Sequence, residues 1–400
     1  MKPWDAKGYK MPGGAPYSAP GFPTFVGASA MVHGKTMGVY PAARALLAAV
    51  YEGALVPFDT ALRIEARHFT SVLMNPSSSA MIRSLFINKE ALDKGANRPK
   101  VADQAVKKLG VIGAGMMGAG IAYVSANAGI EVVLIDSTQE AADRGRAQSE
   151  AILDKGIKRG KVTAEKKAEV LARIAATTDY AALKGVDLVV EAVFEDPKVK
   201  AEVTAKVEAA VGPDCIYATN TSTLPITGLA AASERPEQFI GIHFMNPVPR
   251  MQLVELIRGI VTEDDTFEKA RNFIMKLGKT ITFSEDFPAF IVNRILLPMI
   301  NEAIYTLYEG VSGVEEIDTV MKLGMAHPMG PLQLADFIGL DVCLSILRVL
   351  HDGFGNPKYA PCPLLVNMVT AGKLGVKSGE GFYAYTPGAK DLVLAERFKR

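Results

Sequence analysis

The sequence is poor in cysteine and almost neutral, and both features exclude classes of protein. Its 400 residues include three cysteines, Cys215, Cys343 and Cys362, which are far apart and lack the spacing of a metal-binding motif. We therefore expect a reducing compartment, taken to be the cytoplasm, and no metal site. The chain has 44 basic and 43 acidic side chains, so its net charge is close to zero. Neither nucleic acid nor an anionic membrane is therefore expected as a partner.

Long hydrophobic segments of the kind that signals export or membrane insertion are also missing. The N-terminus, "MKPWDAKGYKMPGGAPYSAPGFPTF", is rich in proline and glycine and has no apolar core, so it is not a secretory signal. Residues 109–130 carry no charge and are long enough to resemble a membrane span. Their many glycines indicate a buried strand, a loop and a helix instead, and no membrane span is expected.

Three domains are expected along the chain. Residues 1–105 form an N-terminal extended and helical linker segment, extended up to about residue 35 because proline and glycine recur there. Helical periodicity follows in "PAARALLAAVYEGAL", in "FDTALRIEARHFTSVL", where Asp59 is expected as the N-cap, and in "SSAMIRSLFINKEALDKG". Nothing in these helices forms a catalytic constellation.

The pattern of apolar and polar residues changes near residue 106. Short apolar runs alternate with amphipathic segments up to residue 287: "KKLGVIGAG", "EVVLID", "VDLVVEAV", "CIYATN" and "FIGIHF". That alternation predicts an α/β domain, a mainly parallel sheet covered by helices on both faces. Residues 288–400 show only helical periods bounded by glycine or proline, so an all-helical C-terminal domain is expected.

A glycine motif follows the first apolar run. Gly113, Gly115 and Gly118 form G-x-G-x-x-G between a strand pattern and a helix pattern, and Asp136 ends the second strand pattern about 20 residues on. Such a loop binds the pyrophosphate of a dinucleotide at the start of a helix. Because Asp136 would accept hydrogen bonds from ribose hydroxyls and repel a 2′-phosphate, the expected cofactor is NAD. The alternative is a glycine turn without a ligand.

A second strand and turn, "VVEAVFEDPKVK", should end at the same edge of the sheet. Ligands of open α/β sheets bind at the carboxyl ends of the strands. Glu195 and Lys200 are therefore candidates for contact with the nicotinamide ribose. They are also explained as solvated residues at the start of a helix.

Further polar residues follow the next strand patterns. His243 and Glu255 lie in "GIHFMNPVPRMQLVEL", where a core histidine and a polar strand edge are the simpler interpretation. If they reach the nicotinamide, however, the imidazole is suited to take a hydroxyl proton while hydride leaves the same carbon. Glu255 would hold the other ring nitrogen. Ser222 and Asn293 offer neutral donors for the substrate oxygen.

These segments together resemble the L-3-hydroxyacyl-CoA dehydrogenase family, in order and spacing, from about residue 107 to 385. The matching motifs are "GAGMMGAGIA", "VEAVFEDPKVK", "NTSTLPI", "HFMNPVPRMQLVEL", "FIVNR", "MGPLQLADFIGLD" and "GEGFYAY". The resemblance implies NAD-dependent oxidation of (3S)-3-hydroxyacyl-CoA to 3-oxoacyl-CoA in fatty-acid β-oxidation. It implies His243 as base, Glu255 as its partner, and Ser222 with Asn293 as substrate contacts.

The same resemblance assigns the cofactor contacts. They are Gly113, Gly115, Met116, Met117, Gly118, Asp136, Glu195, Lys200 and Asn220, with Asn246 also near the cleft. The family carries a helical hairpin that contacts CoA where "DKGIKRGKVTAEKK" stands. Lys155, Lys158 and Arg159 would meet the CoA phosphates there, or they form a solvated helix face.

The chain departs from the family pattern in two places. "FPAF" replaces the usual Pro-Gly before "FIVNR", which suggests a stiffer connection to the helical domain. Residues 1–105 look like the segment that joins hydratase and dehydrogenase parts in bifunctional α-subunits of β-oxidation complexes, while the hydratase core is missing. We therefore expect a homodimer or a fragment of a larger β-oxidation complex.

Two other functions were weighed against this one. The β-hydroxyacid dehydrogenases share the glycine loop and a helical second domain, but they use a lysine on the first long helix, and "FIVNRILLPMINEAIYTLYEG" has none. A non-catalytic NAD-binding or structural relative of the same fold is the second alternative. The presence of His243, Glu255, Ser222 and Asn293 argues against it.

Overall fold

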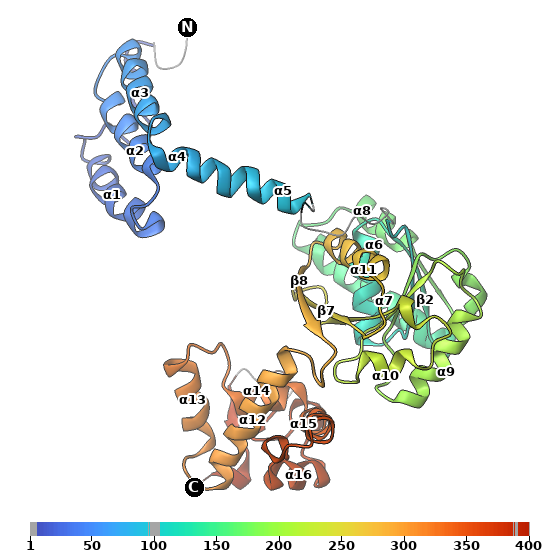
Figure 1. Ribbon diagram of the computed structural model, residues 1–400. Coiled ribbons are helices and arrows are strands. Elements are labelled where there is room, and N and C mark those ends of the chain that lie inside the picture. Colours follow the sequence, from blue (N-terminus) through green and yellow to red (C-terminus); the bar gives the residue numbers. More distant parts are fainter. Residues whose placement is uncertain (1–5, 95, 97–104, 387, 389–390, 400) are drawn as a thin grey trace. The chain divides into compact units, whose positions relative to one another are not determined.

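The computed structural model describes residues 6–94, 96, 105–386, 388 and 391–399. The chain divides into two compact units, Met1–Lys100 and Val101–Arg400. The first unit is helical, and the second contains an α/β part followed by a helical part, as the sequence predicted (Figure 1).

The first unit contains a helix at residues 22–36 that the sequence did not predict. Its elements are α1 (Phe22–Thr36), α2 (Pro41–Gly53), α3 (Phe58–Leu73), α4 (Pro76–Met81), the π-helical η2 (Ile82–Asn88) and α5 (Lys89–Asp93). The prediction of extended or loop structure up to about residue 35 holds for residues 6–21, which form turns, but was wrong from residue 22. The last proline there, Pro23, lies in the first turn of α1, where a missing N–H is tolerated. The N-cap of α3 is Pro57, so Asp59 is not the cap but lies in the first turn.

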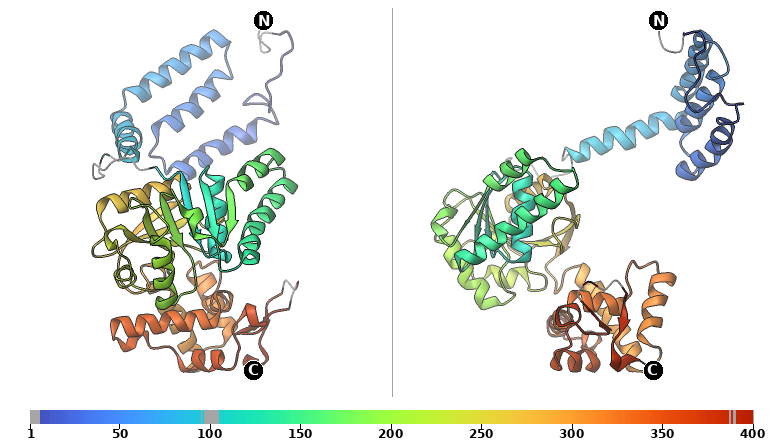
Figure 2. Two further views of the ribbon diagram at one scale, coloured as in Figure 1. Left: turned by 90° about the vertical axis from the view of Figure 1, so that its right-hand side faces the viewer. Right: turned by 180° about the vertical axis from the view of Figure 1, so that it is seen from behind.

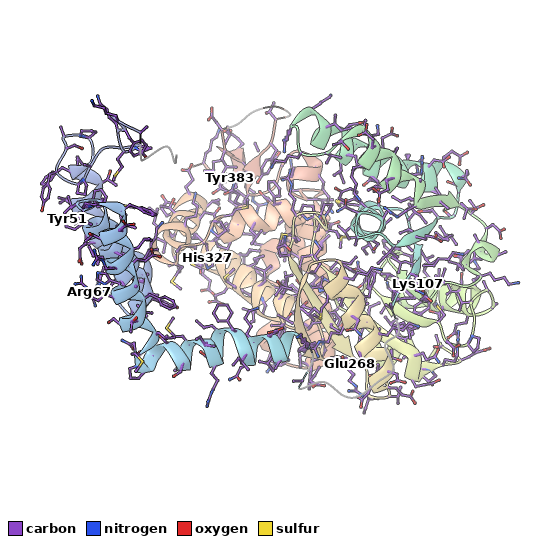
Figure 3. All side chains as sticks on the ribbon, turned by 90° about the horizontal axis from the view of Figure 1, so that it is seen from above. Tyr51, Arg67, Lys107, Glu268, His327 and Tyr383 are labelled. Atoms are coloured by element: carbon purple, nitrogen blue, oxygen red, sulfur yellow. The ribbon has the colours of Figure 1, made fainter. Side chains whose placement is uncertain are left out.

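Polar contacts and rings hold the first three helices together, because none of α1–α4 contains a buried residue. In Figure 2, α2 lies beside both α1 and α3. Glu52 on α2 contacts Arg67 at 2.6 Å and His68 at 2.9 Å, both on α3. The Tyr51 hydroxyl donates to that of Tyr17 at 2.7 Å; Tyr51 and Arg67 are labelled in Figure 3. Among the residues of this unit that the structure describes, no apolar side chain belongs to a buried core cluster of the kind that stabilises an independent domain.

The second unit is built on an eight-stranded sheet in the order β3-β2-β1-β4-β5-β6-β7-β8. Every neighbouring pair is parallel except β6 and β7. The strands are β1 (Lys108–Ile112), β2 (Glu131–Ile135), β3 (Ile174–Thr177), β4 (Leu188–Glu191), β5 (Ile216–Thr219), β6 (Phe239–Phe244), β7 (Leu253–Arg258) and β8 (Thr280–Glu285). The five strands that the sequence predicted are confirmed. Strands β3 and β8 escaped prediction because neither is a continuous buried apolar run.

Successive side chains along a strand point to opposite faces of the sheet and so belong to two different cores. One core joins residues such as Val111 and Leu134 to α6 (Met116–Asn127), α7 (Gln139–Lys158), α8 (Ala164–Ala172) and α11 (Asp264–Lys276). The other joins residues such as Ile112 and Val133 to α9 (Pro197–Glu208) and α10 (Ile226–Ala230). Residues 109–130 form β1, a loop and α6, as expected, and no described helix is long and apolar enough to cross a membrane.

The C-terminal part is helical, with a small addition. Its helices are α12 (Val292–Tyr308), α13 (Val314–Gly324), α14 (Pro331–Ile338), α15 (Leu340–Phe354) and α16 (Pro363–Thr370). They enclose a core that includes Leu297, Leu347 and Phe382. The prediction of an all-helical domain missed β9 (Tyr383–Ala384) and β10 (Val393–Leu394), an antiparallel pair too short to leave a periodic signal.

Two buried carboxylates connect the helices of this part to strand β9. Asp318 on α13 accepts the backbone N–H groups that open α14, from Leu332 at 2.8 Å and Gln333 at 3.0 Å. Asp336 on α14 accepts the backbone N–H of Phe382 at 3.0 Å and of Tyr383 at 2.9 Å. The Tyr383 hydroxyl, labelled in Figure 3, closes the network on Asp318 at 2.8 Å. Burial raises the pKa of Asp336 to about 6 despite these donors.

The raised pKa of Asp336 predicts a pH dependence of stability. Because its folded pKa of about 6 lies above its ordinary value of 3.8, the folded state binds this proton more tightly. Its stabilising effect is full below pH 4 and is lost as the pH rises through 6, on the order of 3 kcal/mol in all. Asp336→Asn should remove that part of the slope when the free energy of unfolding is measured between pH 4 and pH 7.

The exposed Asp265 on α11 offers a matched control, because it lies outside the buried network. Asp265→Asn should keep the slope of the unchanged protein. Equal slopes for Asp336→Asn and the unchanged protein would contradict the prediction.

Candidate active site

Several of the predicted site residues follow parallel strands that end at one edge of the sheet. Ile112 at the end of β1 pairs with Ile135 of β2 and with Glu191 of β4, and Glu191 pairs in turn with Thr219 of β5. The chain leaves β3 on one side of β1 and re-enters the sheet at β4 on the other. Ligands of open α/β sheets bind in the crevice at such a reversal of strand order.

The glycine loop has the shape that a dinucleotide requires. Gly113 has a φ of +95°, and a Cβ there would lie 2.6 Å from the carbonyl oxygen of Ala192. A Cβ on Gly118 would lie 1.7 Å from the Gly113 oxygen, so helix and strand meet too closely for any side chain. Gly115, in contrast, faces open space and is the N-cap of α6, which no side chain caps. The loop and this helix start fit a pyrophosphate.

The residues around the loop occupy different environments. Met116 begins α6 and is exposed, whereas Met117 is partly buried against the core. Asp136 follows β2, and its Oδ2 accepts the backbone N–H of Ala114 at 2.7 Å. Its Oδ1 accepts the N–H and hydroxyl of Ser137. The carboxylate is therefore fixed beside the glycine loop, where the ribose next to the pyrophosphate is expected.

Glu195 and Lys200 are in direct contact. Lys200 on α9 is 2% exposed, and its Nζ lies 3.3 Å from Oε2 of Glu195 and 2.8 Å from Oε1 of Glu191. Oε1 of Glu195 accepts the backbone N–H groups of Ser222 at 2.9 Å and Thr223 at 3.2 Å. Sequence reasoning missed Glu191, although an acidic residue inside the apolar run "VVEAV" was a signal that it has a buried partner.

His243 and Glu255 stand directly opposite each other on the antiparallel strands β6 and β7. The Nδ1 of His243 lies 2.7 Å from Oε2 of Glu255. His243 is 5% exposed and Glu255 is fully buried. Because an ionised carboxylate only accepts hydrogen bonds, this contact places an N–H on Nδ1, and a neutral imidazole then has its lone pair on Nε2.

The second oxygen of Glu255 binds the start of the helical part. Oε1 accepts the backbone N–H of Ile291 at 3.1 Å and of Val292 at 2.9 Å, where α12 begins. Just before them, Ala289 and Phe290 have φ values of +63° and +53°. This left-handed region costs a non-glycine residue about 1–2 kcal/mol. The Phe290 ring packs against the His243 imidazole at 5.7 Å between ring centres.

Ser222 and Asn293 also meet. The Nδ2 of Asn293, in the first turn of α12, donates to the Ser222 carbonyl oxygen at 3.2 Å. Asn220, after β5, accepts the backbone N–H of Phe244 at 2.9 Å and so ties this loop to the strand of His243. Asn246 lies exposed in the loop between β6 and β7. Among the described residues, no hydrogen bond joins His243 to Ser222 directly; the connection runs through Glu255 and residues 291–293.

Comparison with known proteins agrees with this geometry. The model of the 3-hydroxyacyl-CoA dehydrogenase NAD binding domain matches residues 108–286, and the model of the C-terminal domain of the same family matches residues 290–385. A 3-hydroxybutyryl-CoA dehydrogenase of Bradyrhizobium diazoefficiens is 58% identical over 287 residues, which are 72% of this chain and 98% of that relative.

Two further relatives show how far the similarity extends. The crystal structure of (S)-3-hydroxybutyryl-CoA dehydrogenase from Ralstonia eutropha is 46% identical, with a TM-score of 0.69 over 70% of this chain and all of that one. A fatty acid oxidation complex subunit alpha of Idiomarina loihiensis is 40% identical over 363 residues, which are 90% of this chain and 50% of the subunit. The chain belongs to the 3-hydroxyacyl-CoA dehydrogenase family, and NAD is its cofactor.

Proposed function

We propose that His243, oriented by Glu255, is the general base in the oxidation of (3S)-3-hydroxyacyl-CoA to 3-oxoacyl-CoA. The observation that supports this most directly is the buried 2.7 Å contact between the two side chains, on strands of the sheet that also carries the glycine loop. When bound, the nicotinamide ring supplies the acceptor for the hydride that leaves C3 of the substrate.

The protein's own groups handle the proton. The Nε2 of His243 takes the proton of the C3 hydroxyl as the C–H electron pair leaves and the C=O bond forms. The imidazole is then a cation, and the Glu255 carboxylate stabilises it while preventing rotation of the ring. Ser222, in the loop after β5, and Asn293, in the first turn of α12, hold the substrate oxygen.

The cofactor contacts are proposed along the same edge. The pyrophosphate lies over Gly113, Gly115 and the start of α6 at Met116 and Met117, with Gly118 allowing the close packing behind it. The adenosine ribose meets Asp136. The nicotinamide ribose meets Glu195 and Lys200, and Asn220 lies near the ring.

We propose fatty-acid β-oxidation as the setting of the reaction. Support comes from the relative named fatty acid oxidation complex subunit alpha, whose match of 363 residues is longer than residues 106–400 alone and so includes part of the N-terminal unit. The relatives named 3-hydroxybutyryl-CoA dehydrogenase make a four-carbon acyl group the first substrate to test. The three cysteines are buried and free, which supports a reducing compartment such as the cytoplasm.

We also propose that the chain works in an assembly, as a homodimer or within a β-oxidation complex. The N-terminal unit supports this, because its helices bury no residue and display large apolar side chains. The most exposed large apolar side chains of this unit lie on its helices and in the segments next to them: Tyr17, Val26, Met31, Met37, Val39, Leu46, Phe69, Met74 and Phe86.

Loss of the imidazole should abolish turnover. His243→Gln is expected to lower kcat for NADH oxidation with acetoacetyl-CoA by roughly 10²–10⁴-fold, the range that general bases contribute. The affinity for NADH, measured by fluorescence titration, should stay the same. His327→Gln is the matched control, since His327 (Figure 3) lies in the segment between α13 and α14 and is not one of the proposed site residues. Normal turnover by His243→Gln contradicts the proposal, and NADH binding without turnover by the unchanged chain supports the non-catalytic alternative.

The double role of Glu255 predicts a combined defect. Glu255→Gln replaces one accepting carboxylate oxygen with an NH₂ group, which only donates. Either the imidazole or the backbone N–H groups at the start of α12 then lose their acceptor. We expect kcat to fall on the order of 10²-fold and the free energy of unfolding to fall by about 1–3 kcal/mol.

Thr163→Ala serves as the control for Glu255→Gln. It removes only the hydroxyl that caps α8 at the N–H of Lys166, which costs about 1 kcal/mol and leaves kcat unchanged. A Glu255→Gln enzyme that is destabilised like Thr163→Ala but has normal kcat would contradict the orienting role.

Analytical ultracentrifugation tests the assembly. We expect sedimentation equilibrium at several concentrations to give the mass of two chains, because an isolated N-terminal unit leaves its apolar side chains in water. The same measurement on residues 106–400 alone shows whether the N-terminal unit or the rest of the chain forms the contact between copies. This shorter chain is a reasonable test because relatives of about this length are whole proteins. A single-chain mass at every concentration argues against the homodimer.

A further inference from the structure

Glu191 is the last residue of β4 and has no access to any ligand. It is 1% exposed and receives four hydrogen bonds from inside the protein. Its Oε1 accepts the backbone N–H of Val193 and the Nζ of Lys200, both at 2.8 Å. Its Oε2 accepts Lys200 Nζ at 3.1 Å and the hydroxyl of Thr219 at 2.8 Å. A carboxylate offers about four such positions, so all are used.

This arrangement fixes the direction of the Lys200 ammonium group. An ammonium group has three N–H donors. Two of them face the oxygens of Glu191, which leaves the third for Oε2 of Glu195, the longest of the three contacts at 3.3 Å. Glu195 has a side chain that is 36% exposed, whereas those of Lys200 and Glu191 are 3% and 1% exposed. The three charges therefore form a line from the sheet interior to the surface of the site.

The line ends on the loop that carries Ser222. The other oxygen of Glu195 accepts the hydroxyl of Thr221 and the backbone N–H groups of Ser222 and Thr223. A ribose diol can donate to a carboxylate, and the exposed end of the line offers the carboxylate of Glu195, with the buried ammonium group of Lys200 directly behind it. Glu191 supplies the two shorter contacts of the Lys200 ammonium group, at 2.8 and 3.1 Å, and Glu195 supplies the third. Glu195 is held from the other side by the Ser222 loop.

We infer that Glu191, held by Thr219, is a positioning residue for the cofactor: it aims the Lys200 ammonium group, and through it Glu195, at the nicotinamide ribose. This inference rests on the proposed contacts of Lys200 and Glu195 with that ribose. A purely structural ion pair is the other interpretation, because removal of one partner from any buried pair destabilises a protein. The two interpretations differ in what happens to cofactor affinity when both partners are removed.

A double-mutant cycle separates them in the full chain. Glu191→Gln is nearly isosteric but brings an amide N–H₂ group against Lys200 or Thr219. We expect the KM for NAD to rise about tenfold or more, while kcat at saturating NAD and the KM for the acyl-CoA change less than about threefold. Lys200→Met should raise the KM for NAD similarly. In the double variant the KM should be no higher than in Lys200→Met alone, because Glu191 then has nothing to aim.

Glu268→Gln is the matched control. Glu268 (Figure 3) is a carboxylate of the same domain that is 2% exposed and paired with Arg271 at 3.4 Å, on α11. It should lower Tm and leave the KM for NAD unchanged. The inference is overturned if Glu191→Gln behaves in the same way, or if the KM effects of Glu191→Gln and Lys200→Met multiply in the double variant.

Two more variants keep the result decisive. If neither Lys200→Met nor Glu195→Gln changes the KM for NAD, the proposed ribose contacts are wrong and the inference falls with them, whereas the His243→Gln result stands apart. If Glu191→Gln does not fold, Thr219→Val puts a methyl group in place of the hydroxyl that donates to Oε2 at 2.8 Å and accepts the backbone N–H of Thr221 at 3.3 Å. It should then raise the KM for NAD about two- to fivefold, and an unchanged KM overturns the inference.

Discussion

The carboxylate of Glu255 is the contact on which the rest of the site depends, because it joins the base to the start of the helical domain. One oxygen fixes the proton-bearing nitrogen of His243, and the other accepts the first two N–H groups of α12. The next residue, Asn293, then reaches the Ser222 loop. A shift of α12 would therefore disturb both the imidazole and the proposed substrate contacts. The left-handed residues Ala289 and Phe290 bring the chain to this position.

Carboxylates that accept backbone N–H groups recur throughout the second unit. Asp136 binds the glycine loop, Glu195 binds the Ser222 loop, and Asp286 binds the N–H groups of Ile226 and Thr227 that open α10. Asp336 does the same in the helical part. Hydrogen bonds to a charged carboxylate are stronger than those between neutral groups. They fix loops whose backbone is not held by the hydrogen bonds of a helix or a sheet. The polar edge of the sheet is thus rigid before any ligand arrives, which favours catalysis.

Most of the α/β architecture was predictable, because a strand buried on both faces appears as a continuous apolar run and a glycine motif has a local cause. The elements that escaped prediction have weaker signals. β8 alternates in burial and lies at the sheet edge, and β3 has four residues. α1 was missed because prolines before its first turn dominated the composition. Within the site, Glu191 was missed because its importance comes from Lys200, nine residues further along the chain.

The sequence by itself determined which chemical groups are present and where chain direction changes: a glycine turn, an acid one strand later, and an imidazole and a carboxylate in consecutive apolar runs. Only the tertiary structure decided which groups meet. The antiparallel pairing of β6 and β7 places His243 opposite Glu255, and a shift of one residue would turn one of them to the other face. Register and domain docking arise from packing between distant segments, and no local pattern encodes that.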